Sequence, residues 1–231
     1  MTILSVCQGV AKVIGIDVPD AVTSSTDREY VELLAVAHTM ADRIAKGHEW
    51  QMFSTIHTLT GDGSTEDFDL PSDYDRMLVK AQVWSSSLES PLSPVVELDK
   101  WLELDVQSFD FVINAWTIYG GQMHIKPALA SAVTAKFFYQ SNLIITPASG
   151  SNKTEFNDDD DTFRLSEELL KLGMIWQWRA NKGLPYTEDF MNYEQLLSRL
   201  VARDKGSRML RVGKVRLPSD VTIAYPQNVG T

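Results

Sequence analysis

The spacing of apolar residues changes twice along this chain, and these two changes constrain the fold more than any other feature. Before Trp50, apolar residues recur every three or four positions, as on one face of a helix. From Gln51 to about Leu143 the chain is rich in β-branched and aromatic residues between short turn signals. Helical spacing returns at Phe163. The sequence therefore predicts an α+β fold, in which a mainly antiparallel β unit is inserted into a helical bundle.

Four segments have the spacing and the end signals of helices. The strongest runs from Thr26 to Lys46, where Thr26 and Glu29 match a capping box and Gly47 can end the helix. The other three are Ser5–Ile14, Phe163–Lys182 and Thr187–Asp204. Because only a short connection separates the last two, they are predicted to pack antiparallel.

The inserted unit is predicted to contain short strands and one helix. Gly120 and Gly121 supply the positive φ angles of a two-residue turn, so Phe111–Tyr119 and Gln122–Lys126 are predicted to form a hairpin. The other predicted strands are Gln51–Thr60, Phe68–Leu70, Met77–Trp84 and Ala132–Tyr139, and the helix is Val95–Leu104.

These elements divide the chain into three parts. Residues 1–49 and 146–205 are assigned to the helical bundle, residues 50–145 to the β-rich unit, and residues 206–231 to an extended C-terminal tail without helical spacing. No apolar run reaches the roughly 18 residues of a membrane-spanning helix, and the N-terminus lacks the features of a signal peptide. No membrane partner is expected.

Charge is unevenly placed on a chain whose formal net charge is −10. An acidic protein does not wrap a phosphate backbone with its whole surface. The segment from Arg203 to Arg216 is nevertheless basic, and an acidic run lies far from it in the sequence. Two surfaces with different partners would explain this asymmetry, and so would two solvated stretches.

The acidic run is Asp158, Asp159, Asp160 and Asp161. It lacks the alternating ligands and the fixed glycine of a calcium loop. Burying four adjacent carboxylates without cations would be costly, so the loop from Asn157 to Asp161 is predicted to be exposed. The four residues are expected to tolerate replacement by asparagine.

The sequence shows no motif of a metal site or of a nucleophilic enzyme. A single cysteine, Cys7, excludes an intrachain disulfide and a zinc ribbon. The four histidines are His38, His48, His57 and His124. None of them has a second metal ligand three or four positions away together with a plausible third ligand. G-x-S-x-G and P-loop patterns are absent. No cofactor, no structural metal and no catalytic residue are predicted.

Two alternatives remain open. The first is a small hydrolase, because carboxylates cluster between Glu66 and Asp75. Enzymes that hydrolyse glycosides use a pair of carboxylates about 5 to 9 Å apart. The other is a host- or carbohydrate-binding module that uses the β unit as its binding surface. Among six tryptophans, Trp176 and Trp178 cannot face the same side of a helix, so one of them is a candidate for an interface with the β unit or with another subunit.

In their order and spacing, several segments resemble the head-to-tail adaptor proteins of tailed bacteriophages, including the gp4-like tail accessory proteins. The resemblance covers roughly Thr26 to Leu200. The segments that carry it are Trp50-Gln51-Met52-Phe53, Leu70-Pro71-Ser72-Asp73-Tyr74-Asp75-Arg76-Met77, Gln82-Val83-Trp84, Tyr119-Gly120-Gly121-Gln122-Met123-His124-Ile125-Lys126-Pro127, Phe137-Phe138-Tyr139-Gln140-Ser141, Asp158–Phe163 and Gly173-Met174-Ile175-Trp176-Gln177-Trp178-Arg179.

The resemblance implies a structural virion protein without catalytic residues. Adaptors of this kind form a ring, usually of twelve subunits, beneath the portal; the ring extends the DNA channel and offers a platform to tail or nozzle proteins. It implies assembly in the host cytoplasm and a place at the head-tail interface. Double-stranded DNA would pass without specific binding, because an acidic channel repels phosphates. In such a ring, the acidic run would face the channel or a neighbouring subunit.

The C-terminal tail is the candidate for the portal-docking element. Its basic residues lie two or three positions apart among apolar ones, as in an extended segment that binds an acidic groove or adds a strand to a sheet edge. The candidate docking residues are Arg208, Arg211, Val212, Lys214, Val215, Arg216 and Leu217.

Overall fold

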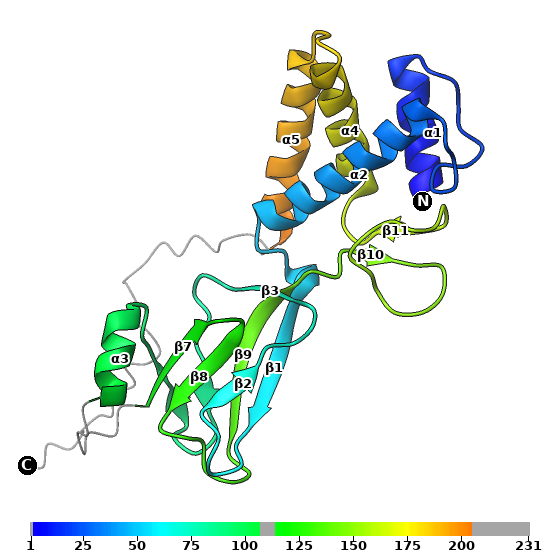
Figure 1. Cartoon of the computed structure of the whole chain (residues 1–231). Coiled ribbons are helices and arrows are strands. Elements are labelled where there is room, and N and C mark those ends of the chain that lie inside the picture. Colours follow the sequence, from blue (N-terminus) through cyan, green and yellow to red (C-terminus); the bar gives the residue numbers. More distant parts are fainter. Residues whose placement is uncertain (1, 107–113, 205–231) are drawn as a thin grey trace, which may run out of the picture.

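The structure is a computed structural model, and it describes residues 2–106 and 114–204. Figure 1 shows a helical lobe and a β-rich lobe. Two chain segments join them, one before and one after the β-rich region in the sequence. The five helices of the described residues are α1 (Ile3–Ile14), α2 (Arg28–Gly47), α3 (Leu98–Val106), α4 (Glu167–Asn181) and α5 (Thr187–Asp204). The predicted α+β class is confirmed.

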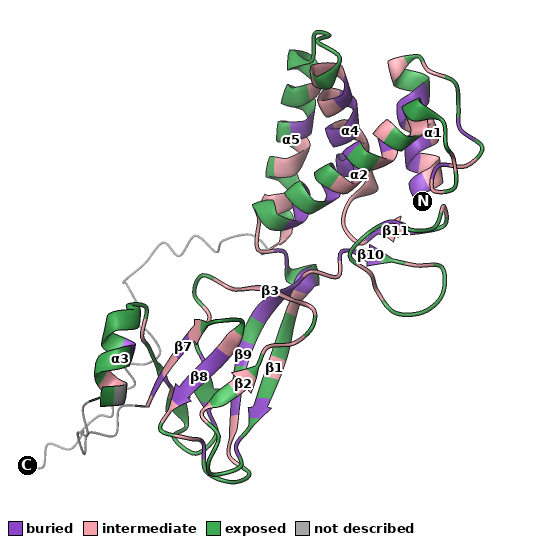
Figure 2. Ribbon diagram, in the orientation of Figure 1, coloured by how far each residue is buried: buried purple, intermediate pink, exposed green. Residues whose placement is uncertain are grey.

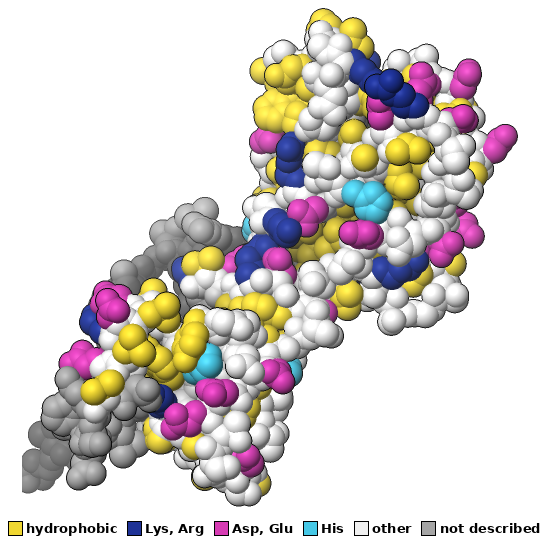
Figure 3. Space-filling model, viewed as in Figure 1, with side chains coloured by type: hydrophobic (Ala, Val, Ile, Leu, Met, Phe, Trp, Pro, Cys, Tyr) yellow, Lys and Arg dark blue, Asp and Glu magenta, His cyan; other side chains and the backbone are white. Residues whose placement is uncertain are grey.

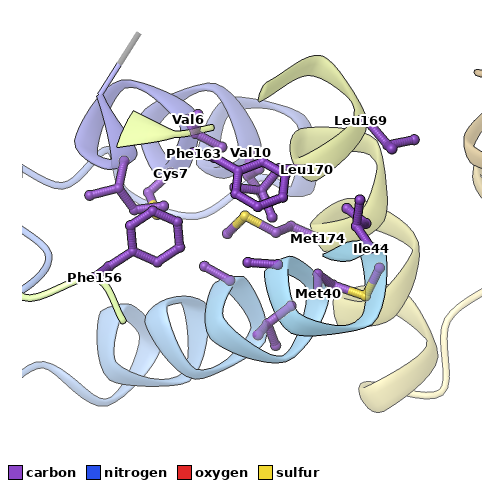
Figure 4. Packing of buried hydrophobic residues seen from close by; sticks show 14 of the residues in the cluster. Val6, Cys7, Val10, Met40, Ile44, Phe156, Phe163, Leu169, Leu170 and Met174 are labelled. Carbon is purple, nitrogen blue, oxygen red and sulfur yellow. The ribbon is translucent and has the colours of Figure 1, made fainter. Parts of the chain in front are cut away.

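Helix α4 lies at the centre of the helical lobe. It packs against α1, α2 and α5. Gly173 allows α2 to approach closely, because a Cβ at this position would lie 2.7 Å from Met40 Cε. The side chains that meet between the helices include Val6, Cys7, Val10, Met40, Ile44, Phe156, Phe163, Leu169, Leu170 and Met174, as Figure 4 shows.

The starts of α2 and α1 differ from the sequence prediction. The predicted capping box at Thr26 does not form, because α2 begins at Arg28 and its N-cap residue, Asp27, makes no side-chain cap hydrogen bond. Helix α1 begins at Ile3, ahead of the predicted Ser5, because the Thr2 hydroxyl accepts a hydrogen bond from the Ser5 N–H.

Helix α4 begins four residues later than predicted. The Ser166 hydroxyl accepts a hydrogen bond from the Leu169 N–H and so places the helix start at Glu167. Phe163 instead belongs to a two-stranded sheet of β10 (Ile145–Thr146) and β11 (Thr162–Phe163). Between these two strands, Phe156 is buried in the helical core.

The β lobe consists of two sheets around a second buried cluster. One sheet has the order β1-β9-β4-β5, with β3 also paired to β9, and the other has the order β2-β8-β7-β6. A 3₁₀ turn at Gln51–Phe53 precedes the first strand. The strands are β1 (Ser54–Thr60), β2 (Asp67–Asp69), β3 (Tyr74–Met77), β4 (Trp84–Ser85), β5 (Ser90–Pro91), β6 (Ser93–Pro94), β7 (Ala115–Tyr119), β8 (Gln122–Lys126) and β9 (Thr134–Ser141). Figure 2 shows buried residues gathered in each lobe.

The predicted hairpin is present in the described residues. Strands β7 and β8 pair from Tyr119 with Gln122 to Ala115 with Lys126. Gly120 and Gly121 both have positive φ, at 60° and 83°, as the turn requires. Among the strands of the described residues, all pairs are antiparallel except β6 with β7.

The predicted strand from Met77 to Trp84 is wrong. Strand β3 ends at Met77 and β4 begins at Trp84. Between them the Ala81 N–H donates to the Leu78 carbonyl, which makes a turn. Val83 is fully buried, so its apolar character reflects core packing and not strand alternation.

Candidate interaction surfaces

The segment from Leu70 to Met77 organises the end of the β lobe that meets the helices. The Asp73 carboxylate accepts hydrogen bonds from the Tyr139 hydroxyl at 2.8 Å and from the Ser141 hydroxyl at 2.7 Å. Burial of Tyr139 and its hydrogen bond to Asp73 raise the pKa of this tyrosine to about 12. Asp73 thus fixes the last residues of β9 from a loop that lies far away in the sequence.

Arg76 joins this segment to the helical lobe. One of its guanidinium nitrogens donates to the carbonyl oxygens of Lys46 at 3.2 Å and of His48 at 3.3 Å, at the C-terminal end of α2. The other binds the Asp75 carboxylate at 2.6 Å. A cation at a helix C-terminus satisfies carbonyl groups that have no partner within the helix and interacts favourably with the helix dipole.

Replacing Arg76 with glutamine is expected to loosen the connection between the lobes without unfolding either core. Two charge-assisted hydrogen bonds to carbonyls are lost at a half-buried site, which costs roughly 1–2 kcal/mol of unfolding free energy. Hydrogen exchange at residues 46–50 should accelerate in the variant. Arg28→Gln is the control, since Arg28 is an exposed arginine that pairs with Glu32 one turn along α2. Equal exchange in both variants would show that Arg76 does not hold the junction.

Two further residues connect the lobes. Arg164 donates to the carbonyl of Leu143 and, at 3.1 Å, to that of Met52, so it binds both connecting segments at once. Asp204, the last residue of α5, accepts a hydrogen bond from the Gln51 N–H at 3.1 Å. Neither contact could be read from the sequence, because each joins residues more than twenty positions apart.

The acidic run is where the structure departs most from the sequence prediction. Asp161 is 0% exposed. Its Oδ2 accepts hydrogen bonds from the N–H groups of Asn157 at 2.8 Å and Asp158 at 3.0 Å, and from Lys153 Nζ at 3.0 Å. Lys153 Nζ also lies 2.9 Å from Oδ1, but without hydrogen-bond geometry.

These contacts determine the charge state of Asp161. Burial alone would raise its pKa, but the two N–H groups and the Lys153 ammonium outweigh burial and hold the pKa below its ordinary value. The carboxylate is thus a charged, partnered group in the interior. The prediction that the whole run is exposed is wrong for Asp161, because a lysine and two backbone donors replace water around it.

Asp159 has a structural role as well. Its Oδ1 accepts hydrogen bonds from the N–H groups of Val22 at 3.0 Å and Thr23 at 2.9 Å, and from the Thr23 hydroxyl at 3.0 Å. The backbone carbonyls of Asp159 and Asp161 accept the N–H groups of Leu4 and Ile3. The run therefore holds the start of α1 and the α1–α2 loop in place. Only Asp158 and Asp160 are exposed.

The two candidate tryptophans lie against their own subunit. Trp178 is 5% exposed and belongs to the helical core. Trp176 packs on α5, where its ring meets Phe190 edge-on at 5.3 Å and lies near Tyr186 and Tyr193. The apolar surface available to a partner is instead beside them, at the tip of the α4–α5 hairpin.

The carboxylates between Glu66 and Asp75 have separate structural partners. Asp67 binds His124 Nδ1 at 2.6 Å, Asp69 accepts from the Gln122 amide at 2.8 Å, and Asp75 binds Arg76. His124 Nε2 also lies 3.2 Å from the Tyr119 carbonyl oxygen. The first two contacts attach β2 to β8, and the third joins two neighbours within β3. These structural contacts explain why the carboxylates occur in this segment without invoking a hydrolase activity.

Exposed apolar side chains gather in three places. One is the outer face of the larger sheet, with Ile56, Trp84 and Phe138, and another is the exposed side of α3, with Leu98, Leu102 and Val106. The third is the α4–α5 tip, with Leu184, Tyr186, Phe190 and Met191. Figure 3 shows hydrophobic side chains over the outer side of the α4–α5 hairpin and beside α3. Contiguous exposed apolar surface of this kind marks sites of protein association.

Some predicted features cannot be placed. The tail residues from Arg208 to Leu217 lie outside the described residues. Within residues 2–106 and 114–204, no group of three or more His, Cys, Asp or Glu side chains is arranged to hold a metal ion. In the same residues no helix is long and apolar enough to cross a membrane.

Two lobes tied by polar contacts, with apolar surface exposed on each, are the features expected of a structural subunit that assembles with other chains. The family model described as SU10 adaptor protein matches residues 1–216, so both lobes and the junction are included. The chain belongs to this family of phage structural adaptor proteins. No curated protein matches the chain.

Proposed function

We propose that this protein is a head-to-tail adaptor that forms a ring beneath the portal, extends the DNA channel and provides the attachment platform for tail or nozzle proteins. The family match over both lobes is the observation that carries the proposal. The three exposed apolar surfaces support it, because a ring subunit needs one surface for each neighbour and another for the next component. Assembly would take place in the host cytoplasm, and the finished ring would serve genome packaging and ejection.

The charge of the chain suits a channel. With a net charge of −10, a ring of this protein would repel the phosphates of double-stranded DNA, so that DNA passes without specific binding. Asp158 and Asp160 are the members of the acidic run that remain able to face a channel or a neighbouring subunit. The α4–α5 tip, which includes the surroundings of Trp176, is the proposed contact between neighbouring subunits.

Mass photometry of the protein with a purified portal ring of the same phage tests the proposal. We expect the mass of the portal ring to rise by that of twelve adaptor subunits. A different increment would correct the copy number, and no increment would refute portal binding. Electron microscopy of the complex would then show whether the adaptor continues the portal channel.

Truncation after Lys205 tests the proposed docking role of the tail. The shortened protein should keep the helix and strand content of the described lobes in circular dichroism, since α5 ends at Asp204. It should fail to join portal rings in a pull-down, because the basic and apolar docking residues from Arg208 to Leu217 are removed. Normal portal binding by the truncated protein would transfer docking to the lobes.

A further inference from the structure

Strand β1 has one edge without a partner. It is paired along its whole length with β9, from Ser54 with Gln140 to Thr60 with Thr134, and it is the terminal strand of its sheet. Within the described residues, no other backbone hydrogen bond involves positions 55–59. About half of the N–H and C=O groups of this seven-residue strand therefore point away from the sheet.

This edge lacks the usual protection against strand addition. Proteins blunt long edges with lysine, proline, bulges or covering segments. The sequence of β1, Ser-Thr-Ile-His-Thr-Leu-Thr, has no lysine and no proline, and its register with β9 is continuous. Beside it on the outer face, Ile56 lies opposite Phe138, and Trp84 lies diagonal to Phe138; the three are 50 to 55% exposed. Such an edge favours a further strand with apolar side chains on one face.

The chain itself contains a segment with the required pattern. Residues 221–225 read Val-Thr-Ile-Ala-Tyr, with apolar residues at alternate positions, and Pro218 and Pro226 flank them. β-branched and aromatic residues alternating between proline boundaries are typical of a short strand. In an added strand, Val221, Ile223 and Tyr225 would lie on one face and could continue the surface formed by Ile56 and Phe138.

The connection has a suitable length. The Asp204 carboxylate binds the Gln51 N–H, three residues before β1, so the chain leaves the described region near the start of that strand. A connection of 17 residue steps, from position 204 to 221, has a root-mean-square end-to-end distance of about 21–25 Å. Strand β1 is about 23 Å long. Effective concentration is greatest when the length of a linker matches the span between two sites, which favours docking within one molecule.

We infer that residues 221–225 add as a strand to the free edge of β1 in the same subunit. The added strand pairs with the outward N–H and C=O groups of β1 and covers Ile56. This contact uses residues other than the proposed portal-docking set, and it is tested on the isolated protein. Its failure would therefore leave the adaptor proposal untouched.

Hydrogen exchange on the full chain and on the chain truncated after Asp204 is the first test. The outward amides of β1 should exchange at least about tenfold faster after truncation, because they lose their hydrogen-bond partners. Amides of α2 should exchange at the same rate in both proteins. Unchanged exchange in β1 would overturn the inference.

Cysteine trapping is the second test. Ile56→Cys is combined in turn with Val221→Cys, Ile223→Cys and Tyr225→Cys, so that the test does not depend on the register. The natural Cys7 is fully buried, and burial raises its pKa to about 12, so it should not compete. At least one pair should give an intramolecular disulfide under mild oxidation. Val31→Cys, similarly exposed on α2, replaces Ile56→Cys as the control. Disulfides no more frequent than in the control, or found only between two molecules, would refute docking in the same subunit.

Discussion

Replacing Asp161 with asparagine is expected to lower the unfolding free energy of the helical lobe by roughly 2–4 kcal/mol. The amide has nearly the shape of the carboxylate, but it loses the charge that Lys153 and the N–H groups of Asn157 and Asp158 compensate. It also brings an NH₂ group into a fully buried site whose neighbours are donors. The start of α1, bound through the Asp161 carbonyl, should loosen with the loop.

Chemical denaturation followed by circular dichroism measures this effect, and Asp160→Asn is the matched control. Asp160 belongs to the same acidic run, but its side chain is exposed, so its replacement should change stability by less than about 0.5 kcal/mol. Equal unfolding midpoints for the two variants would show that the buried contacts of Asp161 are not stabilising.

The effect of Asp161 should also depend on pH. Because the folded state lowers the pKa of Asp161, the charged carboxylate stabilises the fold above the unfolded-state pKa of about 3.9. This stabilisation is lost as the pH falls through the folded-state value. The difference between the native protein and Asp161→Asn should therefore be constant from pH 5 to 7 and should shrink below about pH 4.

Replacing Gly61 with alanine is expected to destabilise the β lobe by roughly 2–4 kcal/mol. Gly61 follows β1 and exchanges backbone hydrogen bonds with Ala132 and Val133. A Cβ at this position would lie 2.4 Å from the Leu129 carbonyl oxygen and 2.6 Å from that of Ala130. Both obstacles are backbone atoms, so the strand connection itself would have to move.

Gly47→Ala is the control for Gly61→Ala. No atom lies within 4 Å of a Cβ added at Gly47, and this glycine is the last residue of α2. Alanine is the better helix former, so the control should be neutral or more stable by up to about 1 kcal/mol. Differential scanning calorimetry of both variants measures the change, and similar melting of the two would contradict the packing argument.

Taken together, the variants at Asp161 and Gly61 test the proposed division of the chain into a helical bundle and a β unit. Each lobe has its own buried cluster, one around α4 and one between the two sheets. If the lobes unfold as separate units, Asp161→Asn should shift one calorimetric transition and Gly61→Ala the other. If both variants shift a single transition, the contacts of Arg76, Arg164 and Asp204 make the two lobes one cooperative unit.

The sequence by itself determined the features that depend on neighbours along the chain. The period of the apolar residues located the helices and the β region, and Gly120-Gly121 located the β7–β8 turn, because side-chain periodicity and positive φ angles are local properties. Helix α5 has the bounds that its apolar stripe predicts. Where a cap decided the helix start, as at Ser166, the local signal was present in the sequence but the apolar pattern began earlier.

Only the tertiary structure decided the partners and the burial of the charged residues. Four adjacent aspartates look alike in a sequence, yet Asp161 is buried against Lys153, Asp159 binds the α1–α2 loop, and Asp158 and Asp160 face solvent. The same holds for Arg76 and Asp73, whose partners lie tens of residues away. The physical reason is that the cost of burying a charge depends on donors and cations brought from elsewhere in the chain, which no local pattern specifies.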